Sequence, residues 1–187
     1  MEHKTLIFII IIVMITTPLP CLSSKNLSNK TPTTSALSSS QYKTLITRNT
    51  MIQQQFLRQH NTLRAKLRLP PLKWSNNIAR YANRWARTRR GDCNLIHSGG
   101  PYGENLFWGS GKGWTPRDAV VAWASERKYY DRRTYRCKAS RDCLHYTQLV
   151  WKKSLRIGCA IGFCKTGDTF IICNYDPPGN IVGQSPF

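Results

Sequence analysis

The sequence predicts an α+β fold in which helices precede a C-terminal β-hairpin. Apolar residues recur at helical spacing from residue 51 onward, beginning with Ile52, Phe56 and Leu63. The last third of the chain instead carries two short apolar runs, "IGCAIGFC" and "DTFIICNY", on either side of the turn sequence "KTG". Helices and strands do not alternate as regularly as a doubly wound fold requires, so the pattern favours the α+β class.

Four helices are expected from this spacing and from the residues that begin and end them. Their predicted ranges are 52–67, 76–91, 116–130 and 145–153. The first stops before Pro70, because the residue that precedes a proline avoids helical angles. Ser75 and Thr115 precede the second and third helices as N-caps, and Pro116 suits a first helical position.

The N-terminus has the three parts of a secretory signal. Lys4 supplies a positive charge, "LIFIIIIVMI" an apolar core, and "PLPCLSS" a cleavage zone. The apolar run is too short to span a bilayer comfortably. Residues 1–24 are therefore predicted to be a signal peptide, and the mature protein is expected to be secreted and extracellular.

Residues 25–50 are rich in Ser and Thr and lack apolar periodicity, which predicts a flexible leader. Asn26 and Asn29 lie in N-x-Ser/Thr sequons and are candidate glycosylation sites. The folded domain is expected to cover residues 51–187.

Seven cysteines are present, of which Cys21 lies in the predicted signal. Six cysteines in an exported chain imply three disulfides. A hairpin turn centred at Thr166 sets Cys159 opposite Cys173, and directly opposed strand positions bring Cβ atoms within disulfide reach. Cys137 and Cys143 are predicted to close a short local loop. Cys93 and Cys164 are the two cysteines that remain, and they are predicted to form the third bond.

The chain is strongly basic, with 28 Lys and Arg against 9 Asp and Glu, for a net charge of +19. Such a charge favours contact with anionic microbial membranes, cell walls or nucleic acid. Export argues against nucleic acid as the partner. The alternative is a basic surface that serves only to keep the protein solvated.

Glutamate is rare, because only Glu104 and Glu126 occur after the predicted signal. Glu126 shares an apolar helix face with Trp123, and a buried carboxylate needs a partner. The partner is expected to be His145, with an ion pair to Arg or Lys as the alternative. Glu104 follows His97 in a Gly-rich segment that is expected to be a loop. Two imidazoles and two carboxylates that converge would suit a zinc or copper ion. The alternative is that each histidine is a structural residue, as His60 on the first helix is expected to be.

Two motifs carry a family resemblance. "HYTQLVW" at 145–151 and "CNYDPPGN" at 173–180 resemble the signatures of the CAP superfamily, which includes cysteine-rich secretory proteins, antigen five and plant pathogenesis-related proteins of group one. "HSGGPYGENLFWGSG" and "PPGNIVGQSPF" are similar to the plant branch. The resemblance covers roughly residues 51–187.

The resemblance implies a three-layer α-β-α sandwich with the three disulfides already given. It also implies a central cavity with a divalent metal, zinc being expected, at four residues matched by motif: His97, Glu104, Glu126 and His145. Leu144 departs from the family, which usually has glycine before the second histidine.

The implied function is plant defence, in which an antimicrobial protein binds or sequesters sterols or other lipids. The family's sterol-binding loop matches "ERKYYDRRTYRC", where Tyr129, Tyr130 and Tyr135 offer flat apolar faces. Arginines interleave these tyrosines and would suit anionic head groups. The alternative is that the tyrosines only pack the loop onto its own disulfide.

Two rival functions remain. In some plant relatives the last eleven residues act as a defence signal, and the matching peptide here is 177–187, released after Asp176. The alternative is that this tail simply packs on the domain.

A metal-dependent hydrolase is the other rival, but Ser98 is expected to point away from the cavity that His97 faces, because neighbours in an extended segment alternate. The protein is therefore not expected to be an enzyme.

Overall fold

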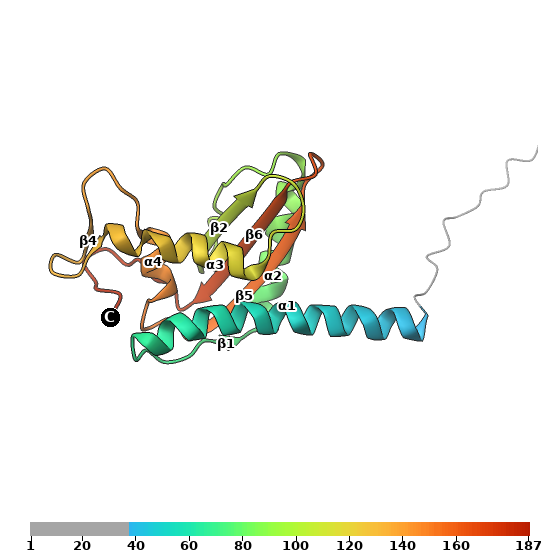
Figure 1. Cartoon of the computed structure of the whole chain (residues 1–187), viewed down its shortest axis with the longest axis horizontal. Helices are drawn as coiled ribbons and strands as arrows, with labels where there is room; N and C mark the ends of the chain where they lie inside the picture. The colour runs from blue at the N-terminus through green and yellow to red at the C-terminus, as the bar shows by residue number, and fades with distance from the viewer. Residues whose placement is uncertain (1–37) are drawn as a thin grey trace, which may run out of the picture. The chain divides into compact units, whose positions relative to one another are not determined.

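The computed structural model describes residues 38–187, which fold into helices packed on a central sheet (Figure 1). Its α-helices are α1 (Ser39–Lys66), α2 (Asn76–Thr88), α3 (Pro116–Ser125) and α4 (Leu144–Leu149). Short 3-10 turns follow α2 at Arg89–Gly91 and α3 at Glu126–Tyr129. The predicted signal peptide 1–24 and the sequons at Asn26 and Asn29 lie outside the described residues.

The main sheet has four strands in the order β1-β5-β6-β2. They are β1 (Lys73–Trp74), β2 (Gly103–Gly109), β5 (Arg156–Phe163) and β6 (Thr169–Asp176). Strand β1 runs parallel to β5, and the other neighbours are antiparallel. A small second sheet pairs β3 (Tyr130–Asp131) with β4 (Arg136–Cys137). This mixture confirms the predicted α+β class.

The sheet is covered on both faces, because side chains along β6 alternate between two clusters. Phe170 and Ile172 pack with Ala82 and Ala86 of α2 on one face. Ile171 and Cys173 belong to the cluster on the opposite face, which α1, α3 and α4 cover. Figure 1 shows α2 on one side of the sheet and these helices on the other, so the helices and sheet form three layers.

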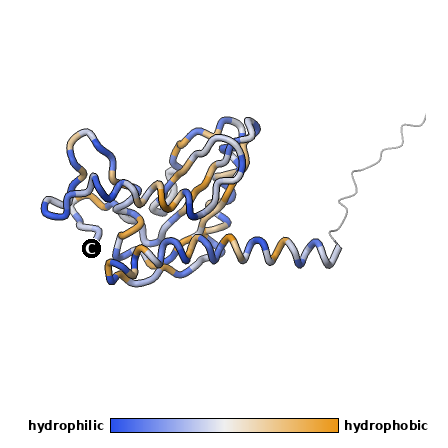
Figure 2. The backbone as a smooth tube through the Cα atoms, viewed as in Figure 1, coloured by the Kyte–Doolittle hydropathy of each residue, from blue (hydrophilic) through white to orange (hydrophobic). Residues whose placement is uncertain are grey.

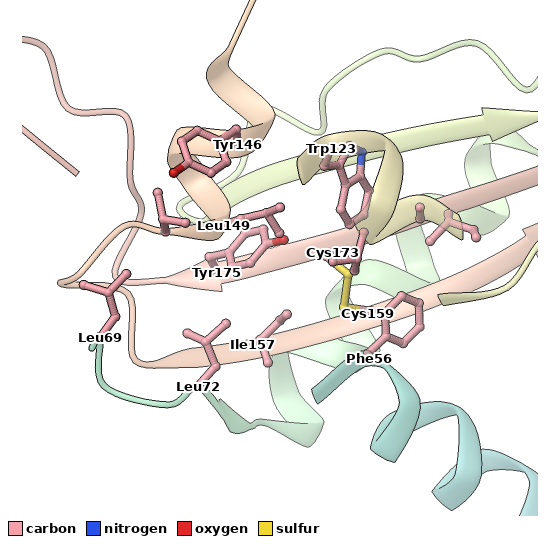
Figure 3. Packing of buried hydrophobic residues seen from close by; sticks show 14 of the residues in the cluster. Phe56, Leu69, Leu72, Trp123, Tyr146, Leu149, Ile157, Cys159, Cys173 and Tyr175 are labelled. Atoms are coloured by element: carbon pink, nitrogen blue, oxygen red, sulfur yellow. A yellow bond between two sulfur atoms is a disulfide. The ribbon is translucent and has the colours of Figure 1, made fainter. Parts of the chain in front are cut away.

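The larger cluster joins residues that are distant in the sequence. Phe56 of α1, Trp123 of α3 and Tyr146 of α4 are buried against the sheet residues Ile157 and Tyr175. Figure 3 shows these side chains around the Cys159–Cys173 disulfide. The indole nitrogen of Trp123 also donates to the main-chain oxygen of Leu106 at 2.8 Å, which ties α3 to β2.

All three predicted disulfides are present, namely Cys93–Cys164, Cys137–Cys143 and Cys159–Cys173. The hairpin register is also as predicted, since Cys159 pairs directly with Cys173 across β5 and β6. The first bond ties the segment before β2 to the end of β5. The second closes the loop that carries β4.

Helix α1 begins at Ser39, so the predicted leader 25–50 is wrong for its last twelve residues, 39–50. The Ser38 hydroxyl accepts from the Gln41 N–H, and the Gln41 side chain accepts from the Ser38 N–H. This capping box stabilises a helix start that apolar periodicity does not reveal. Residues 39–51 are exposed, and Figure 1 shows this part of α1 extending past the sheet. Figure 2 shows hydrophilic and hydrophobic residues mixed along it.

Two further expectations differ from the structure. The Gly-rich segment that contains Glu104 is not a loop, because residues 103–109 form β2 along β6. Helix α4 ends at Leu149 rather than near residue 153. The Lys152 N–H donates to the carbonyl of Pro186 at 2.6 Å, so the chain after α4 bonds to the C-terminal tail instead of continuing the helix.

The tail 177–187 packs on the domain through main-chain and side-chain hydrogen bonds. The Gly179 N–H donates to the Gln148 side chain at 2.9 Å, and the Asn180 side chain bonds Thr147 at 2.6 Å. Phe187 packs on Tyr130, with ring centroids 6.2 Å apart. Across residues 38–187, none of the helices has the length and apolar character that a membrane span needs.

Candidate functional site

Two His–Glu pairs lie at the end of the molecule where β2 begins. His97 precedes β2 and Glu104 is its second residue. His145 lies in the first turn of α4, and Glu126 follows the last residue of α3. Four separate segments therefore supply the residues that the sequence singled out.

Glu104 is held by several donors. Its carboxylate accepts from the His97 Nδ1 at 2.8 Å, the Ser98 N–H at 2.9 Å, the Ser98 hydroxyl at 2.6 Å and the Asn174 amide at 2.9 Å. Burial alone would raise the pKa of Glu104, but these hydrogen bonds hold it below its ordinary value. The hydrogen bond that His97 donates to Glu104 in turn raises the pKa of His97. Only 5% of the Glu104 side chain is exposed, against 63% of the His97 side chain.

Glu126 holds His145 in a similar way. Its carboxylate lies 2.7 Å from the His145 Nδ1 and also accepts the main-chain N–H of His145 at 3.0 Å. The His145 ring stacks on Trp123, with centroids 6.4 Å apart. The carboxylate thus caps the start of α4 and fixes the orientation of the imidazole.

A polar cavity of about 280 Å³ lies between the two pairs. His97, Glu104 and His145 contribute to its lining, together with Asn105 and Gln148. Glu126 does not line it, because this residue sits behind the His145 ring. The four residues predicted to share a cavity therefore form two pairs, of which three members face it.

Both imidazoles bond a carboxylate through Nδ1, which leaves Nε2 as the atom available to a metal. A carboxylate behind a histidine is the usual support for a metal ligand. Among residues 38–187, however, no three His, Cys, Asp or Glu side chains converge as a metal site. Within the described residues, the candidate ligands are the two imidazoles, and solvent or a bound molecule would have to complete the coordination.

Ser98 does not point away from the cavity, so that expectation is wrong. Both His97 and Ser98 bond Glu104 and line the cavity. The alternation rule applies to an extended strand, whereas this segment is irregular and turns at Gly99, which has a φ of +66°. The Ser98 hydroxyl also accepts from the Tyr81 hydroxyl at 3.0 Å.

The three tyrosines of the predicted lipid-binding loop occupy different environments. Tyr130 is buried in the core, and its ring packs on Tyr146 with centroids 5.9 Å apart. Tyr129 is partly buried, with Lys128 and Arg141 over its ring. Tyr135 is 58% exposed. Of these three tyrosines, only Tyr135 therefore has a side chain that is largely open to solvent.

A second hollow, of about 260 Å³, separates this loop from the C-terminal tail. Tyr135 lines one wall, Leu144 and Trp151 belong to α4 and the segment that follows it, and Ile181 and Val182 form the tail wall. Leu144, which replaces the usual glycine, is 53% exposed and therefore adds apolar surface to the opening.

Sequence reasoning missed the residues that hold the site together. Asn174 lies directly opposite Glu104 in the β2–β6 register and bonds it. The Asn105 amide, next along β2, donates to the His145 carbonyl at 3.0 Å and joins the two pairs. Recognition of 103–109 as a strand would have placed both residues, because the register of β6 then sets their partners.

Residues 57–175 match the CAP family, described as the cysteine-rich secretory protein family. The chain belongs to the CAP family. It is 47% identical over 135 residues to pathogenesis-related protein 1C of Nicotiana tabacum, which covers 72% of this chain and 80% of that protein. It is 48% identical over 134 residues to the pathogenesis-related protein PR-1 of Medicago truncatula, covering 71% and 78%.

These identities place this CAP protein in the pathogenesis-related group-one (PR-1) branch. The fold agrees with solved structures. Venom allergen-like protein 4 of Schistosoma mansoni superposes with a TM-score of 0.57 at 26% identity, covering 71% of this chain and 90% of that one. The CAP sandwich thus positions both the polar cavity and the apolar hollow described above.

Proposed function

We propose that this PR-1-type protein is a secreted plant-defence protein that binds sterols or other lipids. The observation that carries the proposal is the apolar hollow between the loop 130–143 and the C-terminal tail. It lies beside the loop where the family resemblance locates sterol binding, and Tyr135 faces it. Relatives named pathogenesis-related protein 1 support the defence role.

The shape of the hollow suits a flat ligand that stays partly exposed. Ligand pockets that enclose a small molecule occupy about 300–1,000 Å³, and this hollow of about 260 Å³ is slightly smaller. A rigid ring system would lie along Tyr135 and Leu144 with one face open. The net charge of +19 would bring the protein to anionic microbial membranes or cell walls, where lipids are accessible.

A binding assay with a fluorescent sterol tests this site. The variant Tyr135→Ser/Ile181→Ser removes one apolar side chain from each wall, and saturable binding should weaken by at least about tenfold. Tyr130 is left intact because it is part of the core. The matched control is Val121→Ser/Leu155→Ser, which removes two exposed apolar side chains elsewhere and should bind as the native protein does. Equal losses in both variants, or no saturable binding by the native protein, would contradict the proposal.

A divalent metal in the polar cavity is a further part of the proposal. His97 and His145 would hold a zinc ion through Nε2, while Glu104 and Glu126 fix the two rings. Such an ion would supply a Lewis-acidic centre for an anionic group. Titration calorimetry with zinc should show binding that is lost in His97→Ala and in His145→Ala, but retained when Asp142 of the cavity rim is replaced by Asn.

Binding is favoured over hydrolysis because neither carboxylate is free to act as a general base. Glu104 accepts from three residues, and Glu126 accepts from His145 and from the Tyr146 N–H at 3.3 Å. The hydrogen bonds also hold the pKa of Glu104 below its ordinary value, so this carboxylate takes up a proton poorly.

Release of the tail 177–187 remains a second candidate function. Pro177, on the tail side of the bond that would be cut, is exposed, which favours access by a protease. Asp176 itself is ion-paired with Arg156 at 2.5 Å, next to the bond that would be cut. Mass spectrometry after incubation with fluid from infected tissue tests this role, and an intact C-terminus at Phe187 would rule it out.

A further inference from the structure

The arginines of α2 and of the 3-10 turn that follows it have no part in either site described above. Arg84 and Arg89 lie over the rings of Tyr81 and Trp85, and Arg89 also pairs with Asp92. Arg80 and Arg87 instead lie on one exposed face of the helix, seven residues apart. Within the described part of the chain, neither has a carboxylate within 4.0 Å. This face of α2 therefore carries uncompensated positive charge.

The same face borders the free edge of the sheet. Strand β1 covers only the start of β5, at Arg156 and Ile157. The Ser75 N–H donates to the Ile157 carbonyl, so the main-chain groups of Ile157 point away from β6. Because these groups alternate along a strand, those of Cys159 and Ile161 point the same way. In the region from 38 to 187, no strand covers that part of the edge.

A groove follows this edge between α1 and α2. Its volume is about 420 Å³, and it is continued by a hollow of about 220 Å³ toward the end of β5. Ile161 and Asn83 line both parts. Arg80 lines the first part, Arg87 and Arg90 line the second, and neither part contains an acidic residue.

The two walls of the groove differ in chemistry. The α2 wall is basic and polar, with Arg80, Asn83 and Arg87. The opposite wall carries the apolar side chains of Ile52 from α1 and Trp74 from β1. Side chains of a strand that is added at an edge alternate between the two faces of the sheet. Such a strand would therefore direct every second side chain toward the arginines and the intervening ones toward Ile52 and Trp74.

We infer that the free edge of β5 binds an extended acidic peptide segment of a partner protein, which adds to the sheet as a further strand. Its main chain pairs with the free groups of Cys159 and Ile161, as in other complexes formed by strand addition. Its carboxylates lie toward Arg80 and Arg87, and apolar residues at alternate positions face Ile52 and Trp74. A second copy of this chain is disfavoured as the occupant, because two molecules of charge +19 repel each other.

The experiment uses a short capped peptide that alternates glutamate with valine, measured by fluorescence polarisation at about 0.15 M salt. Saturable binding is expected, with new protection of the Ile161 amide against hydrogen exchange. A peptide of the same sequence with alternate main-chain amides N-methylated keeps its charge but loses its donors. It should bind at least about tenfold more weakly.

The variant Arg80→Gln/Arg87→Gln should also weaken binding by at least about tenfold. Its matched control is Arg117→Gln/Arg133→Gln, which removes the same charge from exposed positions elsewhere and should leave binding within about twofold. Equal binding of the methylated peptide, or equal loss in the two arginine variants, would show only charge attraction and overturn the inference. Protection of the Ile161 amide in a dimer without peptide would overturn it as well, because a second copy would then occupy the edge.

Discussion

At the scale of single residues, His60 shows how burial and hydrogen bonds set a protonation state. Its Nδ1 lies 2.8 Å from the Phe56 carbonyl, which only accepts, so this nitrogen carries the proton. Its Nε2, 2.9 Å from the Tyr175 hydroxyl, is then the acceptor. Burial raises the pKa of Tyr175, so this hydroxyl stays protonated and able to donate. Burial lowers the pKa of His60 from 6.5 to about 4, and these contacts give the residue the structural role expected of it from the sequence.

This shift predicts a pH dependence of folding stability. The unfolded chain binds a proton at His60 near pH 6.5, whereas the folded protein resists protonation until about pH 4. The free energy of unfolding should therefore be highest above pH 6.5 and fall by about 3 kcal/mol as the pH drops to 4. Urea unfolding across this range should show the fall in the native protein and a clearly smaller fall in His60→Gln, in which only other groups such as Glu104 and His97 still titrate. An equal slope in both proteins would contradict the assignment.

Arg64 is a buried charge that the sequence did not reveal. Burial lowers its pKa to about 10, so it remains charged at neutral pH. Its guanidinium donates to the main-chain carbonyls of Leu149, Trp151 and Ser154, at and after the end of α4, at 2.9–3.1 Å. It also donates to the carbonyl of Pro70, in the segment after α1, at 2.8 Å. It thereby satisfies oxygens that the short helix leaves without partners.

We expect Arg64→Met to lower the free energy of unfolding by about 3 kcal/mol or more, because each buried carbonyl without a donor costs about 1–3 kcal/mol. Arg58→Met on the exposed face of the same helix is the control, and it should change stability by less than about 0.5 kcal/mol. Chemical denaturation of both variants measures the difference. Similar values would mean that these hydrogen bonds do not stabilise the fold.

At the scale of elements, α1 and α2 have the same type of cap but different surroundings. Ser38 and Ser75 each accept a main-chain N–H from the first turn. The first turns of α1 are exposed, and its first buried side chain is Phe56. Helix α2 buries Ile78 within its first turn. Loss of the cap should therefore destabilise only the first turns of α1, whereas at α2 it should lower the stability of the whole domain.

Replacement of either serine by alanine should cost about 1 kcal/mol at the helix start. In Ser38→Ala this cost should appear only as faster hydrogen exchange in residues 39–51, with an unchanged midpoint of global unfolding. In Ser75→Ala it should lower global stability, because the start of α2 is part of the packed domain. A lower midpoint for Ser38→Ala would show that the exposed half of α1 contributes to the cooperative unit.

At the scale of the whole molecule, the disulfides close loops of very different length. Cys93 and Cys164 are separated by 71 residues, whereas Cys137 and Cys143 are separated by 6. The chain-entropy model gives about 4 kcal/mol for the long loop and about 2 kcal/mol for the short one.

Conversion of the first pair to alanine should therefore lower the thermal midpoint more than conversion of the second. Cys93→Ala/Cys164→Ala also leaves a gap in the cluster beneath α2, which adds to the loss. Calorimetry of the two double variants measures the order. The reverse order would mean that the loop with β4 contributes more to the fold than its length suggests.

The sequence by itself determined the elements whose signals are local. Ser75 and Thr115 start their helices because an N-cap needs only the next turn, and the hairpin register follows from its own turn. The disulfides then follow from that register and from cysteine count. The family motifs likewise lie in short contiguous stretches, so they identified the PR-1 branch before any packing was known.

Only the tertiary structure decided what depends on distant partners. Glu104 lies on a strand because β6, some seventy residues further along, supplies the other half of the ladder. Tyr130 is buried and Tyr135 exposed because the tail and α4 cover one side of their loop. The free edge of β5 exists because β1 is only two residues long. A sequence records each residue with its neighbours, whereas these outcomes depend on which remote surface each residue meets.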